Sequence, residues 1–154
     1  VDEALRNVQV PGSVTFRCLT RDQEVFVDAD MFVRVLVNLV NNAVQAMPGG
    51  GDVWVDCVRE GGYDVVSVGD SGVGMSGEVA ESLFKPFFTT KAKGMGLGLS
   101  VCKQVVGYHG GEIWAESVEG KGAVFYVKVP SEERVSVEAG EAEMVEHATL
   151  TQAE

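Results

Sequence analysis

The polar side chains between Asp30 and Met47 are unusual for a helix, because most of them are amides. They recur at spacings of three and four residues: Arg34, Asn38, Asn41, Asn42 and Gln45. On a helix, such spacing places side chains on one face. Asparagine costs a helix about half a kcal/mol relative to alanine, and a solvated face ordinarily carries lysine and glutamate. Amide oxygens suit a magnesium ion that already holds phosphate oxygens, so the row is either a solvated face or part of a metal and phosphate site.

A carboxylate, Asp70, ends a valine-rich stretch and is followed by Gly72 and Gly74. In one interpretation this aspartate simply caps a turn. In the other, the glycines let a flat ligand approach the backbone, and the carboxylate accepts a hydrogen bond from an amine on that ligand. An acceptor here favours adenine over guanine, because a mismatched buried polar pair costs about 1–3 kcal/mol.

Alternate glycines form a third group, in the sequence Gly94-Met-Gly96-Leu-Gly98-Leu-Ser100 just before a helical stretch. Exposed backbone N–H groups and a helix N-terminus both favour phosphate. The Gly-Lys-Ser/Thr of a P-loop is missing, and a Rossmann glycine loop would directly follow a strand. The other interpretation is a merely flexible loop.

The elements that must position these residues follow from hydrophobic periodicity. Apolar residues recur at helical spacing from Phe32 to Met47 and alternate in several short stretches. We expect helices over residues 30–47, 76–84 and 99–108, and strands over residues 14–19, 52–59, 63–69, 112–117 and 123–129. Residues 85–98 form an irregular connection. This order predicts an α+β fold, a two-layer α/β sandwich in which a mixed sheet packs on helices.

Composition limits the classes of partner. The chain has 154 residues, enough for one compact domain. Its net charge of −11 argues against binding to nucleic acid or to an anionic membrane surface, and its apolar stretches are too short to span a bilayer. The cysteines are Cys18, Cys57 and Cys102, an odd number without a CxxC pair. This argues against a disulfide scaffold and a thiolate zinc site, so we expect reduced, buried thiols in a cytosolic protein.

Taken in order, these groups resemble the catalytic ATP-binding domain of two-component sensor histidine kinases. Asn38–Asn42 looks like the N box of that family, and residues 68–74 look like its first glycine box. Residues 83–91 (Leu-Phe-Lys-Pro-Phe-Phe-Thr-Thr-Lys) look like its F box, and residues 94–100 like its second glycine box. The resemblance covers about residues 13–130. It implies the Bergerat ATP-binding fold.

The resemblance also implies roles for matching residues. Asn42 would ligate Mg²⁺ and, with Lys91, act in catalysis, while Asp70 would bind the adenine amine. Residues 85–97 would form an ATP lid, and Gln45 stands where the family often has a basic residue. The whole implied ATP-binding set is Asn38, Asn42, Gln45, Asp70, Gly72, Gly74, Phe87, Lys91, Lys93, Gly94, Gly96, Leu97, Gly98 and Leu99.

The implied reaction is transfer of the γ-phosphoryl group of Mg-ATP to a histidine on a separate dimerisation domain, with a response regulator downstream. Related ATPases carry a glutamate as general base four residues before the magnesium-binding asparagine. This chain has Asn38 there, so we expect slow hydrolysis. The alternative is a non-catalytic, nucleotide-dependent protein-binding module.

The remaining expectations concern the ends of the chain and its location. We expect residues 1–12 to be the remnant of a linker from an absent dimerisation domain, and residues 131–154 to be an acidic, disordered tail. His109 has a structural role in this interpretation, because it lies in a His-Gly-Gly sequence that begins a strand. We expect a cytoplasmic location, with no direct membrane contact by this domain, whether or not the parent protein is membrane-anchored.

Overall fold

The computed structural model describes residues 10–20, 23–88 and 96–132. The predicted linker over residues 1–12 and the predicted tail over residues 131–154 therefore lie almost wholly outside the described residues. The same holds for residues 89–95 of the predicted ATP lid, which include Lys91, Lys93 and Gly94.

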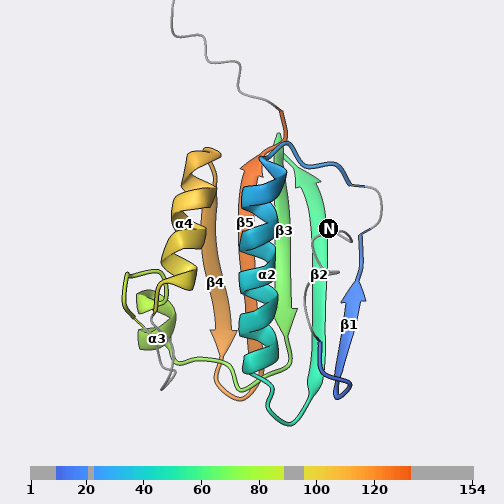
Figure 1. Ribbon diagram of the computed structural model, residues 1–154, viewed down its shortest axis with the longest axis vertical. Helices are drawn as coiled ribbons and strands as arrows, with labels where there is room; N and C mark the ends of the chain where they lie inside the picture. The colour runs from blue at the N-terminus through green and yellow to red at the C-terminus, as the bar shows by residue number, and fades with distance from the viewer. Residues whose placement is uncertain (1–9, 21–22, 89–95, 133–154) are drawn as a thin grey trace, which may run out of the picture.

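The described residues form two layers (Figure 1). One layer is a five-stranded sheet of order β1-β2-β3-β5-β4, with strands β1 (Val14–Cys18), β2 (Gly51–Glu60), β3 (Tyr63–Asp70), β4 (Glu112–Val118) and β5 (Gly122–Pro130). The helices are α2 (Ala29–Gln45), α3 (Gly77–Ser82) and α4 (Gly98–Tyr108), and α2 and α4 cover one face of the sheet. β1 runs parallel to β2, and the other neighbouring strands pair antiparallel. The predicted two-layer sandwich with a mixed sheet is confirmed.

The predicted helices and strands are all observed, with small shifts at their ends. Helix α2 begins one residue earlier than predicted, because Asp28 caps it by accepting the N–H of Met31 at 2.9 Å. It ends at Gln45, shortly before Pro48 and the glycines that follow. Within the described ranges, no helix is long and apolar enough to cross a membrane.

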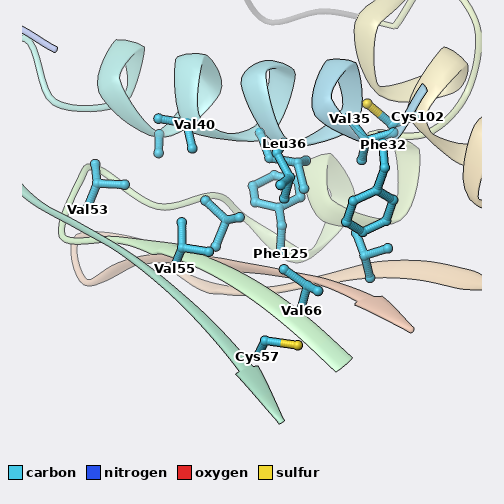
Figure 2. Close-up of a cluster of buried hydrophobic side chains, with 14 of the residues drawn as sticks. Phe32, Val35, Leu36, Val40, Val53, Val55, Cys57, Val66, Cys102 and Phe125 are labelled. Atoms are coloured by element: carbon cyan, nitrogen blue, oxygen red, sulfur yellow. The ribbon is translucent and has the colours of Figure 1, made fainter. Parts of the chain in front are cut away.

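The hydrophobic core lies between α2 and the sheet (Figure 2). The buried residues of α2 form one stripe: Phe32, Val35, Leu36, Leu39, Val40 and Ala43. They pack on the inward-facing residues of the strands, among them Val53, Val66 and Phe125. Full burial of such a side chain contributes about 1.5–3 kcal/mol. This packing fixes the rotation of α2 and so decides where its amide-bearing face lies.

The cysteines differ from one another in burial. Cys57 and Cys102 are buried, and burial raises the pKa of the Cys57 thiol to about 11 and that of the Cys102 thiol to about 12. Both are therefore neutral core thiols near pH 7, as predicted. Cys18 is only half-buried, and it lies on β1, one of the two edge strands of the sheet. The prediction of a buried thiol was wrong for this residue.

Candidate functional site

A cleft of about 480 Å³ opens between the polar face of α2, the end of β3 and the start of α4. Elements far apart in the sequence meet here because α2 packs on both β3 and α4. The cleft is lined by many of the predicted site residues: Asn38, Asn42, Gln45, Asp70, Gly74, Gly96, Leu97, Gly98 and Leu99. The structure thus brings the three chemically interesting groups of the sequence to one place.

Asp70 is the buried carboxylate of the cleft. It is the last residue of β3 and is only 2% exposed. Its Oδ1 accepts the backbone N–H of Gly72 at 2.8 Å. Burial raises the pKa of Asp70, and hydrogen bonds from the backbones of Gly72 and Ala123 oppose that rise. The result is a buried acceptor at the cleft wall that a backbone N–H holds in place.

The two glycines after Asp70 have different roles. Gly72 is not one of the described residues that line the cleft. Its N–H instead donates to the Asp70 carboxylate. Gly74 lines the cleft with a φ of +66°, and a Cβ there would overlap the carbonyl oxygen of Val118. Only glycine therefore permits this turn and this close approach.

The amide row of α2 is divided by the structure. Asn38 and Asn42 are half-buried and line the cleft with Gln45. Arg34 and Asn41 are exposed and are not among the described residues that line the cleft. Within the cleft, the Nδ2 of Asn42 donates to the Oδ1 of Asn38 at 3.2 Å. The solvated-face interpretation therefore holds for only part of the row.

The N-terminus of α4 supplies backbone donors to the cleft. The first N–H groups of a helix have no hydrogen-bond partner within the helix. At the start of α4, the N–H of Val101 is the first to donate to a carbonyl one turn earlier, that of Leu97. The residue before the helix, Leu97, has a side chain that cannot cap it. The helix dipole also favours an anion at this end. Gly98 and Leu99 bring this terminus to the cleft wall.

Apolar side chains that were not among the predicted site residues form the rest of the wall: Ala46, Val73, Met75, Leu83, Phe88, Ala123 and Phe125. Phe125 also meets Phe84 edge-to-face, with ring centroids 6.4 Å apart. Alternation along β5 is the one sequence signal that could have placed Phe125 on the inner face. Together these residues make the wall of the cleft largely apolar, which suits the faces of an aromatic ring.

Phe87 is placed differently from the implied site. It is 77% exposed, has a φ of +63°, and stands outside the described lining, which contains Phe88 instead. A non-glycine residue rarely adopts this backbone conformation. Because neighbouring side chains in an irregular segment diverge, the sequence could not distinguish the two phenylalanines. Lys91, Lys93 and Gly94 lie outside the described residues.

His109 uses both ring nitrogens within the fold. Its Nδ1 donates to the carbonyl of Val105 at 2.7 Å, and its Nε2 accepts the backbone N–H of Asp28 at 2.9 Å. The imidazole therefore ties the end of α4 to the start of α2. This geometry agrees with the structural role expected for His109.

Known proteins resemble this chain over most of the described residues. The family model described as histidine kinase-, DNA gyrase B-, and HSP90-like ATPase matches residues 27–133. Sporulation kinase C of Bacillus subtilis is 41% identical over 103 residues, which are 67% of this chain and 24% of that protein. Sensor histidine kinase ZraS of Klebsiella oxytoca is 45% identical over 120 residues, which are 77% of this chain and 26% of that protein. The chain thus spans about a quarter of the length of these relatives.

Solved structures share the fold. The catalytic domain of histidine kinase ThkA matches with a TM-score of 0.68 and 35% identity, covering 84% of each chain. The mycobacterial sensor histidine kinase MprB matches with a TM-score of 0.72 and 25% identity, covering 85% of this chain and 89% of that one. The mixed sheet with helices on one face is the fold of histidine kinase catalytic domains.

Proposed function

Because this chain belongs to the family of histidine kinase-, DNA gyrase B-, and HSP90-like ATPases, we propose that it binds Mg-ATP and donates the γ-phosphoryl group to a histidine. That histidine lies on a separate dimerisation domain of a sensor kinase, and a response regulator acts downstream. The observation that carries the proposal is one cleft that contains both a buried carboxylate, Asp70, and the N-terminus of α4. The carboxylate suits an adenine amine, and the helix terminus suits phosphate.

Asp70 supports adenine as the base. Since Asp70 is only 2% exposed and lines the cleft, a further donor reaches its carboxylate from the cleft. Adenine offers an exocyclic amine there, whereas guanine would place its carbonyl oxygen against an acceptor. Such a mismatch costs about 1–3 kcal/mol, which makes GTP bind about 5- to 150-fold more weakly than ATP. The apolar side chains that line the cleft with Asp70 suit the ring of the base.

Asn42 supports magnesium at the phosphate end of the cleft. Magnesium prefers hard oxygen ligands and commonly takes only one or two from the protein, the rest being phosphate oxygens and water. The amide oxygen of Asn42 meets this need, and backbone donors at the start of α4 can hold the phosphates. The bound ion would partly neutralise the phosphate oxygens. Lys91 and Lys93 add positive charge in this proposal, on the strength of the family resemblance.

The residue at position 38 supports transfer over hydrolysis. A carboxylate there could take a proton from water, whereas the amide of Asn38 cannot at neutral pH. An imidazole acceptor needs no such base, because it is already a nucleophile. Phosphoryl transfer is mainly positioning and electrostatic stabilisation, which this cleft provides with neutral amides and backbone N–H groups.

Two measurements test the proposal. Calorimetric titration with ATP and with GTP, each with and without Mg²⁺, should show ATP binding that Mg²⁺ strengthens and much weaker GTP binding. Incubation with γ-labelled ATP and a dimerisation domain of this family should then label a histidine of that domain. ATP binding without transfer would favour the non-catalytic protein-binding module. Absence of nucleotide binding by folded protein would overturn the proposal altogether.

A further inference from the structure

The segment that follows Asp70 forms one side of the cleft without belonging to a helix or a strand. Its residues Val73, Gly74 and Met75 all line the cleft. Met75 is half-buried and packs against the hydrophobic core. Because no sheet or helix ladder pairs the backbone here, separate hydrogen bonds must hold it. The position of Met75 in the cleft wall therefore depends on the contacts of this segment with its neighbours.

The turn that joins β4 to β5 contacts this segment through its backbone. The N–H of Gly120 donates to the carbonyl of Val73 at 2.7 Å. Gly74 lies so close to the carbonyl oxygen of Val118 that a Cβ atom would overlap it. The N–H of Val73 also donates to the carbonyl of Ala46, just after the end of α2, at 3.2 Å. The segment is thus held between the end of α2 and the turn.

A serine hydroxyl joins Met75 to the same turn. Ser117 of β4 pairs with Ala123 of β5, and Ala123 pairs in turn with Asp70 of β3. Paired residues of neighbouring strands share one face of a sheet, so these three side chains form one row beneath the cleft. The Oγ of Ser117 accepts the N–H of Met75 at 2.8 Å and donates to the carbonyl of Gly122 at 2.8 Å. Since a hydroxyl has only one donor, its bond to the carbonyl of Gly122 leaves a lone pair for Met75.

We infer that Ser117 is a positioning residue that holds Met75 against a bound adenine ring. This inference rests on the proposed function, in which Asp70 of the same cleft binds the adenine amine. Ser117 is not among the described residues that line the cleft, so it acts through Met75, whose thioether packs favourably on aromatic rings.

Removing the Ser117 hydroxyl leaves the N–H of Met75 without its hydrogen-bond partner. The segment then adopts its binding position for only part of the time, and the apparent affinity for the ligand falls by that fraction. From the net contribution of one hydrogen bond, the Kd should rise about 2- to 12-fold. A merely structural role would lower the Tm and leave the Kd of the folded protein unchanged.

The test compares Ser117→Ala with the wild type by calorimetric titration with adenosine and with ATP, at a temperature where thermal melts show both proteins folded. Adenosine carries the base without phosphates, so its affinity reports on the base end of the cleft alone. Ser67→Ala is the matched control, because Ser67 is also a half-buried strand serine. Its neighbours Val66 and Val68 are buried in the core, so Ser67 faces the opposite side of the sheet from the helices.

A second pair of variants keeps the test valid if S117A does not fold. Ser117→Thr and Ser117→Val introduce side chains of nearly equal shape, both favourable in a strand, and only threonine keeps the hydroxyl. We expect S117A and S117V to weaken adenosine and ATP binding by the same factor, and S117T and S67A to bind as the wild type does. The factor by which Mg²⁺ strengthens ATP binding should be equal in all these proteins, because Ser117 acts on the base end. In the wild type, adenosine should shift the methyl resonance of Met75.

The outcomes separate the inference from the proposed function. If the wild type binds ATP and folded S117A or S117V binds adenosine equally tightly, the positioning role is overturned and the proposed function stands. The inference also fails if S117T loses as much affinity as S117V, since the hydroxyl is then not the cause, or if adenosine leaves the Met75 methyl resonance unchanged. If the wild type binds neither adenosine nor ATP, the proposed function and the inference fall together.

Discussion

Replacing Asp70 with asparagine changes the acceptor in the cleft with almost no change in volume. The carboxylate accepts the N–H of Gly72 at 2.8 Å and also a backbone hydrogen bond from Ala123. In the proposed complex, an adenine amine is a third donor to the same group. Asparagine has one oxygen and one NH₂ group, so at least one of the three donors then faces another donor.

The expected loss of affinity follows from the charge of this carboxylate. A hydrogen bond to a charged group contributes about 1.5–3 kcal/mol, so D70N should weaken ATP binding by about 10- to 150-fold. Protonation of Asp70 should have a similar effect. Because burial raises the pKa of Asp70, the carboxylate is protonated at a higher pH than an exposed aspartate would be. As the pH is lowered, the ATP affinity of the wild-type protein should therefore begin to fall at that higher pH. The ratio of the wild-type to the D70N affinity isolates this effect from titration of the ATP phosphates.

The stability of the nucleotide-free protein should depend on pH in the opposite sense to the ATP affinity: protonation of Asp70 weakens ATP binding but favours folding. A carboxyl group whose pKa is raised in the folded state favours folding in its protonated form. The contribution of Asp70 is therefore present at acid pH and is lost as the pH rises through its folded-state pKa. At neutral pH, D70N should not lower the Tm, so weaker ATP binding would not reflect unfolding.

Isothermal titration calorimetry at neutral pH gives both affinities, and a thermal melt of each free protein checks the fold. The exposed-site variant N41A provides the control. If D70N is folded and binds ATP as tightly as the wild type, Asp70 does not bind the adenine amine and the adenine assignment is refuted.

The remaining predictions concern two glycines of α4 and the Arg59–Asp64 ion pair. Gly98→Ala should weaken ATP binding, because its Cβ would displace the Asn38 amide that lines the cleft; calorimetry measures the change in affinity. Gly107→Ala, in open space on the same helix, should instead stabilise the fold by about 0.5–1 kcal/mol, and a lower Tm would contradict this reasoning. Arg59→Met should lower the Tm, because the fully buried Asp64 loses a bidentate partner at 2.8 and 3.0 Å. The double variant R59M/D64L should recover part of the loss in thermal melts, while ATP affinity stays unchanged throughout, since Asp64 lies at the other end of β3 from the cleft.

The two interpretations of the amide row on α2 show where sequence reasoning stops. Helical spacing predicted a common face for Asn38, Asn41 and Asn42, and they do share one side of the helix. Which part of that side meets the cleft depends on how α2 rotates against the sheet, which the core packing decides. The row therefore divides into residues that line the cleft and residues that do not, a distinction that periodicity alone does not contain.

The sequence by itself determined the order of the elements, the fold class and the candidate groups, because each depends on local spacing. Helical and alternating periodicity are properties of neighbouring residues, and Asp70 and the glycines stand out through their type and place. Only the tertiary structure decided that Phe88, and not Phe87, lines the cleft, and that the N–H of Gly72 holds Asp70. These facts depend on backbone angles in irregular segments and on contacts between residues far apart in the sequence, such as that of Asn38 with Gly98. No short pattern encodes such contacts, because packing of the whole domain sets them.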